Sequence, residues 1–125
     1  MLGIIATVLA GLTGAGVIFM GIRAFFAPQG AAGFGIPGTP TEDPAFRAWL
    51  SVKAVRDLVS GLFFFILIAH GSTQLLGWFM LAATLVPVGD ALIVLRSRGP
   101  RSAVYGIHGG TAAVMLLISV LLLIA

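Results

Sequence analysis

The chain has 125 residues, of which 59% are hydrophobic and only 9% are charged, and its formal net charge is +3. Soluble domains carry about 25% charged residues, so this composition excludes an ordinary soluble domain. Cysteine is absent, which excludes disulfides, thiol nucleophiles and thiolate metal sites.

Four apolar segments are each long enough to cross a bilayer, which requires about 20 largely apolar residues. They cover residues 1–26, 48–70, 74–95 and 103–125, and together with their connections they use the whole chain. The sequence therefore predicts a single all-α domain over residues 1–125, a bundle of four transmembrane helices.

The first segment, residues 1–26, carries a stripe of small side chains. It lacks a basic N-terminal region and is longer than the apolar core of a signal peptide, so we expect a retained helix. Ala6, Ala10 and Gly14 recur every four residues, a spacing that lets helix backbones approach closely in lipid. This Gly/Ala stripe predicts a helix–helix seam, either inside the chain or with a second copy or another membrane protein.

The connection over residues 27–43 is rich in glycine and proline. Residues 33–38 formally match G-x-G-x-x-G, but no strand precedes them and Pro37 interrupts them, which argues against a dinucleotide site. We expect a tight apolar loop, with Phe34 and Ile36 turned toward lipid or over the bundle.

The second helix has a clear start, because Asp43 is a good N-cap and Pro44 suits the first helical position. Further along, helical spacing places several polar and apolar residues on one face, with Arg56 on its flank. The face holds Lys53, Asp57, Ser60, Gly61 and Phe64.

In the third segment, Pro87 should kink the helix, and Asp90 follows about six residues before Arg96. The fourth segment places His108 about one turn inside the membrane, on a face with Ala112, Met115 and Ser119.

The charged residues all fall on one side of the membrane once the four segments are threaded across it. The connection over residues 70–74 has no fixed charge, and neither terminal segment ends in a charged side chain. Because Lys and Arg are retained on the cytoplasmic side, we expect a multi-pass protein of the cytoplasmic (inner) membrane with both termini outside. The charged residues are Arg23, Glu42, Asp43, Arg47, Lys53, Arg56, Asp57, Asp90, Arg96, Arg98 and Arg101.

Six ionisable residues from all four segments should lie in one layer within about 10 Å of the cytoplasmic boundary. They are Arg23, Lys53, Arg56, Asp57, Asp90 and His108. Ionisable groups at this depth should point into the bundle, and an intramembrane acid suggests a functional site. Two carboxylates in different surroundings can divide acid and base roles, and a histidine beside a carboxylate is a poised base.

We therefore predict Asp90 and His108 as an acid–base pair, Asp57 as a second carboxylate and Arg56 as an orienting cation that could reach Asp90. Predicted ligand-binding residues are Arg23, Lys53 and Ser60. A structural reading stays open, in which Arg23 extends to the headgroups, Lys53 pairs with Asp57 and the layer is an ion-pair network. No metal site or cofactor is expected, since His70 and His108 fall at opposite faces.

Several short motifs are distinctive: Val52-Lys-Ala-Val-Arg-Asp-Leu-Val-Ser-Gly61, Gly21-x-Arg23, Pro28, Gly33-Phe-Gly-Ile-Pro37, Asp90 and His108-Gly-Gly-Thr-Ala112. Together they resemble the small four-helix membrane proteins of domain-of-unknown-function family 4267. The resemblance covers most of the chain and implies the four-helix architecture. It marks Arg56, Asp57, Asp90 and His108 as positions that match the family pattern, and it implies no activity.

The leading hypothesis is a membrane protein that binds a lipophilic small molecule in a polar, cytoplasm-facing pocket, with acid–base chemistry of the isomerase or epoxide-opening type. The alternatives are a non-catalytic accessory subunit of a larger membrane complex and, third, a proton-coupled transporter acting as a homo-oligomer. Beyond membrane lipid, we expect no nucleic-acid partner, because no basic face interleaved with aromatic residues lies outside the membrane.

Overall fold

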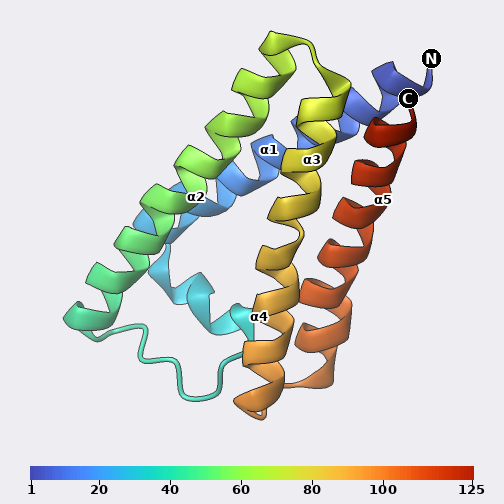
Figure 1. Ribbon diagram of the computed structural model, residues 1–125. Helices are drawn as coiled ribbons and strands as arrows, with labels where there is room; N and C mark the ends of the chain where they lie inside the picture. Colours follow the sequence, from blue (N-terminus) through green and yellow to red (C-terminus); the bar gives the residue numbers. More distant parts are fainter.

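The computed structural model describes residues 1–125 and contains helices only (Figure 1). The α-helices are α1 (Leu2–Phe26), α2 (Pro44–His70), α3 (Thr73–Ala83), α4 (Leu85–Arg96) and α5 (Gly110–Ile124). A short 3-10 helix, η1 (Pro28–Phe34), follows α1, and a π-helical segment, η2 (Ser102–Gly109), leads into α5. The prediction of an all-α chain is confirmed.

Three apolar rods could span a membrane: α1, the continuous pair α3–α4, and η2 with α5. The fourth predicted span, α2, has 27 residues and is long enough, but its composition differs. No stretch of 18 residues in α2 contains fewer than three charged side chains, because Lys53, Arg56 and Asp57 lie inside it. The fold therefore combines three strongly apolar rods with one helix that is polar in its first half.

The ends of α2 follow local rules. The Asp43 carboxylate accepts a hydrogen bond from the Ala45 N–H at 3.3 Å, and Pro44 occupies the first turn, as predicted. The helix stops at Gly71, whose φ of +91° lies in the left-handed region that glycine adopts most readily. α2 can therefore reverse direction into α3 within two residues.

The break between α3 and α4 lies at Thr84, three residues before Pro87. Proline has no N–H, so the carbonyl of Ala83, four residues before it, loses its usual helical donor. The Thr84 hydroxyl donates to the Met80 carbonyl at 2.9 Å and holds the break together. The structure therefore interrupts the helix at Thr84, three residues before Pro87.

The Gly/Ala stripe of α1 is covered inside the chain. Ala6, Ala10 and Gly14 are buried, and a Cβ at Gly14 would lie 2.8 Å from the Cβ of Phe64 in α2. The seam that the stripe predicts is therefore the contact of α1 with its neighbours in the same molecule. The main hydrophobic core lies along it and consists of Ala6, Ala10, Phe64, Leu76, Met80, Met115, Ile118 and Leu122.

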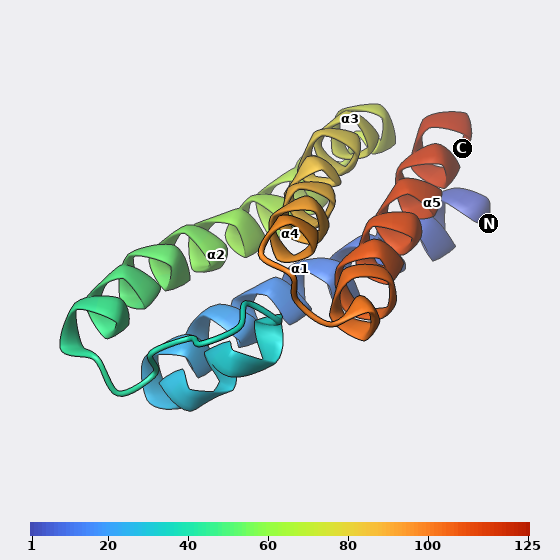
Figure 2. The same ribbon diagram turned by 90° about the horizontal axis from the view of Figure 1, so that it is seen from below.

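At the other end of the molecule, α2 diverges from α4, and η1 with its following loop lies between them (Figures 1 and 2). η1 is anchored to a second small core, made of Val94, Ala103 and Val104, through Phe34. Gly35 follows with a φ of +111°, and a Cβ there would meet Ala103 at 2.7 Å. Only glycine allows the loop to approach the α4–η2 corner this closely.

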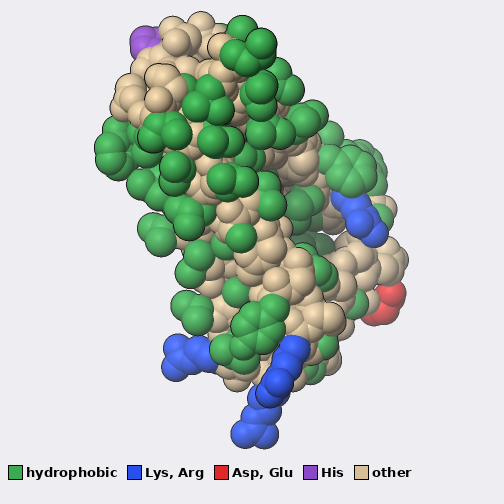
Figure 3. Space-filling view, turned by 90° about the vertical axis from the view of Figure 1, so that its right-hand side faces the viewer, with side chains coloured by type: hydrophobic (Ala, Val, Ile, Leu, Met, Phe, Trp, Pro, Cys, Tyr) green, Lys and Arg blue, Asp and Glu red, His purple; other side chains and the backbone are tan.

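The two termini lie together at the end of the molecule opposite that corner (Figure 1). A Cβ at Gly3 would be 3.6 Å from the Cβ of Ala125. In Figure 3, hydrophobic side chains cover much of the visible face, and the Lys and Arg side chains lie at its lower end and at mid-height on the right. Many large apolar side chains are exposed, as a lipid-facing surface requires, among them Val8, Phe19, Leu85, Leu92 and Leu117.

Candidate functional site

A cavity of about 720 Å³ lies where α2 separates from α4. Its walls come from the end of α1, from η1 and the following loop, from the first half of α2, and from α4 and η2. Most of the lining is apolar and includes Met20, Phe46, Leu50, Ile93 and Ile107. The size and apolar lining are those of a small-molecule site, which typically occupies about 300–1,000 Å³.

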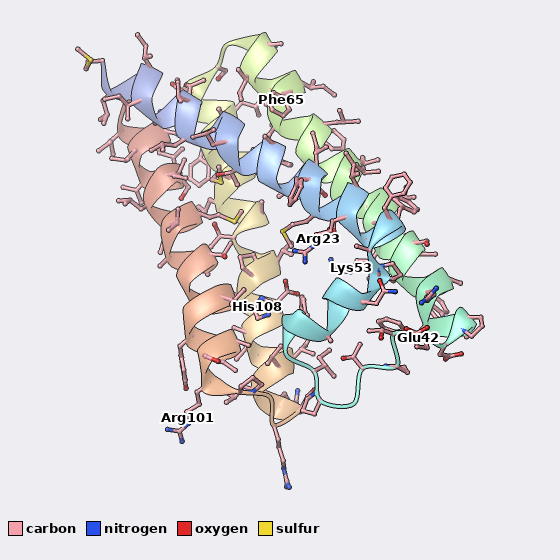
Figure 4. The ribbon with its side chains drawn as sticks, turned by 180° about the vertical axis from the view of Figure 1, so that it is seen from behind. Arg23, Glu42, Lys53, Phe65, Arg101 and His108 are labelled. Atoms are coloured by element: carbon pink, nitrogen blue, oxygen red, sulfur yellow. The ribbon has the colours of Figure 1, made fainter.

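Four of the seven predicted site residues line this cavity: Arg23, Lys53, Asp57 and His108. They come from α1, α2 and η2. The side chains of Arg23, Lys53 and His108 point into the same space between these elements (Figure 4). These four residues therefore line one cavity, and their role as a site stays a prediction.

His108 is buried and holds η1 in place. Its Nε2 lies 2.7 Å from the Phe34 carbonyl oxygen, and the two rings are in contact with centroids 4.3 Å apart. A carbonyl oxygen only accepts hydrogen bonds, so Nε2 carries the proton and donates it. Nδ1 has no hydrogen bond within the chain and is not fully buried, and His108 is one of the residues that line the cavity. In the neutral ring, Nδ1 is then a free proton acceptor.

The π-helical turn of η2 presents His108 at this position. A π-helix places each N–H against the carbonyl five residues earlier, and such turns are frequent at functional sites. A Cβ at Gly109 would lie 3.0 Å from the Val104 carbonyl oxygen, so the absence of a side chain relieves crowding in this wider turn. The sequence analysis did not predict the π-helix, although the pair Gly109-Gly110 is a signal that could have suggested an irregular turn.

Lys53 and Asp57 form the ion pair that their spacing predicts. Lys53 Nζ donates to Asp57 Oδ2 at 2.7 Å, one helical turn along α2. The Asp57 side chain is 22% exposed and that of Lys53 47%, so the pair lies at the rim of the cavity with its charges compensated.

Arg23 is different, because its guanidinium makes no hydrogen bond and no ion pair within the chain. It lies against Gly30 of η1, where an added Cβ would come within 3.3 Å of Nη2. A side chain at position 30 would displace the guanidinium. The cavity therefore has one uncompensated cation.

Asp90 is half-buried in α4, one turn before the cavity-lining Ile93. Its carboxylate forms no hydrogen bond and no ion pair, but it lies within electrostatic range of His108, Lys53 and Asp57. Asp90 therefore interacts with these charges only through space, and it does not line the cavity.

Arg56 and Ser60 lie apart from the cavity-lining residues. Both are exposed and neither lines the cavity. The Arg56 guanidinium donates to the Val52 carbonyl of its own helix at 3.2 Å, so the ion pair with Asp90 that the sequence allowed does not form. The physical reason is the helical turn of about 100° per residue, which directs Arg56 away from the face that holds Asp57.

The role of the connection over residues 27–43 was not predicted from the sequence. It was expected to be an apolar loop, but residues 28–34 form a helix that lines the cavity and supplies the carbonyl partner of His108. Phe34 packs over the bundle, which is one of the two positions predicted for it, the other being toward lipid. Pro28 at the first helical position was the available signal for a short helix.

This arrangement combines an apolar cavity with a free proton acceptor, a free cation, a compensated ion pair and a nearby acid. Such groups can bind a polar head, move a proton and stabilise the charge that results. Nothing in the geometry gathers three metal-ligating side chains of His, Cys, Asp or Glu.

Comparison with known proteins gives one match. The family model described as Domain of unknown function (DUF4267) matches residues 14–122, which include every predicted site residue. No curated protein and no solved structure matches the chain.

Proposed function

We propose a function for this chain, which belongs to the family described as Domain of unknown function (DUF4267), from the chemistry of its cavity. The protein binds a lipophilic small molecule with one polar end, and the apolar wall holds the hydrocarbon part. The observation that carries the proposal is that polar groups from three separate elements, Arg23, Lys53 and His108, enter one apolar-lined space of about 720 Å³. Protein interiors are close-packed, so a space of this size with no role in binding would normally be filled by side chains.

The chemistry is acid–base. His108 accepts a proton from the bound molecule at Nδ1 while Nε2 stays bonded to the Phe34 carbonyl. Asp90 is close enough to stabilise the resulting imidazolium. Returning the same proton to another atom of the molecule completes an isomerisation without any co-reactant, whereas epoxide opening would add a water molecule. Asp57 keeps Lys53 in place beside the polar end.

The molecule sits in the cytoplasmic (inner) membrane with four spans, α2 included, and both termini outside. α2 covers about 40 Å at 1.5 Å per residue, enough to cross. Its charges are tolerable because Lys53 and Asp57 pair and face the cavity instead of lipid. Arg96, Arg98 and Arg101 lie at the α4–η2 corner, so retention of basic residues places the cavity near the cytoplasm.

Reporter fusions test this orientation. A periplasm-dependent reporter attached after Ala125 should be active, and the same reporter inserted at Gly99, in the α4–η2 corner, should be silent. A cytoplasm-dependent fluorescent reporter should give the opposite pattern at the two positions. Activity at Gly99 with silence at Ala125 would mean that the orientation is reversed, and equal signals at both would mean that no span, or an even number of spans, lies between them.

Filling the cavity tests ligand binding. Ala31 lines the cavity and is half-buried, so Ala31→Trp should occupy the space and reduce the co-purified small molecule to background. The measurement is mass spectrometry of a solvent extract from protein purified in mild detergent. Ala32→Trp is the matched control, because Ala32 is the next residue of η1 but is exposed and does not line the cavity. An equal amount of extracted molecule from both variants would contradict the proposal.

The alternative, a non-catalytic accessory subunit, relied on the Gly/Ala stripe of the first helix as a partner surface. Ala6, Ala10 and Gly14 of that stripe are buried within the chain. A second row of small residues on the same helix, Thr7, Gly11 and Ala15, is half-buried to exposed, so a partner would have to use this row or another face. Co-purification of a second protein in fixed proportion, with an empty cavity, would favour this alternative. Uptake of a substrate into vesicles driven by a proton gradient would favour the third hypothesis, a proton-coupled transporter.

A further inference from the structure

We infer that the cavity takes a single-chain amphiphile with an anionic head, a carboxylate or a phosphate, and that Arg23 binds this head. The inference rests on the proposed binding function and specifies its ligand. Two cations, Arg23 and Lys53, line the cavity, and only Lys53 has an acidic partner.

The Arg23 guanidinium offers five N–H donors in a planar fork that matches a carboxylate or phosphate in a bidentate geometry. None of these donors is used within the protein. Arg23 is exposed, so its donors are open to a ligand that enters the cavity, and a charge-assisted bidentate pair there is stronger than a neutral hydrogen bond.

The position of the guanidinium is set by the fold. Arg23 belongs to the last turn of α1, and the chain leaves the helix at Ala27, whose φ of −136° and ψ of 65° are not helical, before it continues into η1. The guanidinium then rests on Gly30, which lacks the side chain that would push it away. Figure 4 shows Arg23 directed toward the space that Lys53 and His108 share. It is thus presented to the cavity.

The other charged residues around the cavity favour Arg23 as the binding site of an anionic head. Lys53 is already neutralised by Asp57 at 2.7 Å, and the α4 side carries the unpaired carboxylate of Asp90. That carboxylate repels an anion and favours a proton donor instead. The head therefore binds at the α1 end, and the chain extends past His108 between the α2 and α4 walls.

The apolar part of the cavity suits one hydrocarbon chain. Met20, Phe46, Leu50, Ile93 and Ile107 supply hydrocarbon contacts along its length. A volume of about 720 Å³ is within the range of small-molecule pockets, about 300–1,000 Å³. The same anionic head could come from a free single-chain acid or from a two-chain membrane phospholipid, and we commit to the single-chain source.

Binding of matched fluorescent probes tests the inference with protein purified in a non-ionic detergent. The probes are a polyene fatty acid and the alcohol of the same chain, which differ only in the charge of the head. The wild-type protein should bind the acid at least about tenfold more tightly than the alcohol, as expected for one charge-assisted hydrogen-bonded pair. Arg23→Gln should remove this preference and leave alcohol binding unchanged. Arg23→Lys should keep part of the preference.

Arg56→Gln is the matched control, since it removes an arginine that is exposed and off the cavity. It should leave both affinities unchanged, and a melting curve in the same detergent confirms that each variant is folded. Equal affinities of wild type for acid and alcohol would overturn the inference while leaving the proposed function intact. Failure of both probes to bind would instead overturn the proposed function.

Competition separates the two sources of the head. A single-chain alkyl phosphate should displace the fluorescent acid, and a two-chain phospholipid with an exposed phosphate should displace it at least about tenfold less well. Equal displacement by the phospholipid would overturn the single-chain assignment, because the cavity would then bind the headgroups of membrane phospholipids.

Discussion

Gly61→Ala should destabilise the protein by about 1–3 kcal/mol, because a single methyl group has no space at this position. A Cβ on residue 61 would lie 2.7 Å from the Gly14 carbonyl oxygen and would also meet the side chain of Ile18. The side chain of Ile18 could turn aside, but the backbone oxygen could move only if α1 and α2 separated. In lipid, where close packing holds helices together, that separation removes the main attraction between them.

The measurement is the melting temperature in detergent, followed by helical circular dichroism or by aggregation. Gly16→Ala is the control, since Gly16 also lies within a helix but has no atom within 4 Å of its added Cβ. Removing a helical glycine in open space should be neutral or gain up to about 1 kcal/mol. Similar melting temperatures for Gly61→Ala and Gly16→Ala would contradict the close contact of α1 and α2.

His108→Ala should release η1 from the α4–η2 corner. The substitution leaves the Phe34 carbonyl without its donor, at a cost of about 1–3 kcal/mol, and removes a ring contact worth about 0.5–1.5 kcal/mol. The loss is local, because the main core along α1 contains no part of this contact. The expected result is an open η1 on a folded bundle.

The absence of cysteine makes this opening measurable by thiol labelling. A cysteine introduced at Ala31, which faces the cavity, should react with a maleimide at least about tenfold faster in the His108→Ala background. A cysteine at the exposed Ala32 should react at the same rate in both backgrounds. Unchanged labelling at position 31 would mean that Gly35 and Phe34 hold η1 without His108.

Two further variants separate the structural role of His108 from its chemical one. His108→Gln can keep an N–H donor for the Phe34 carbonyl but has no ring nitrogen to accept a proton. It should therefore preserve slow labelling at position 31 while the extracted small molecule changes to an isomer of equal mass. Asp90→Asn removes no hydrogen bond or ion pair, so it should leave the melting temperature unchanged or raised. A large loss of stability there would favour a purely structural charge network.

Sequence reasoning could identify the ends of helices because the signals are local. Asp43 with Pro44 starts α2 and Gly71 ends it, and each acts within its own turn of backbone. The ion pair of Lys53 with Asp57 is equally local, since positions four apart always meet on a helix surface. The face of η2 and α5 that carries His108, Met115 and Ser119 was also correct, as all three are buried.

Contacts between distant residues could not be found in this way. Arg56 and Asp90 have complementary charges and similar depth, yet the direction of Arg56 on α2 keeps them apart, and depth alone does not fix direction. The contact of His108 with Phe34 joins residues 74 apart in the chain, and it depends on the path of η1. Ser60 shares a helical face with Asp57, yet it is exposed and does not line the cavity.

The sequence by itself determined the helical class, the apolar rods, the caps and the local ion pair, because each follows from the composition or spacing of residues within a few turns. The tertiary structure alone decided that η1 forms one wall of the cavity. It also decided that Arg23 lines the cavity without an acidic partner and that Arg56 does not line it. These outcomes depend on how rigid helices cross and diverge. The crossing of α1 and α2 is set by where Gly14 and Gly61 allow the two backbones to touch, a relation between distant positions that no local pattern contains.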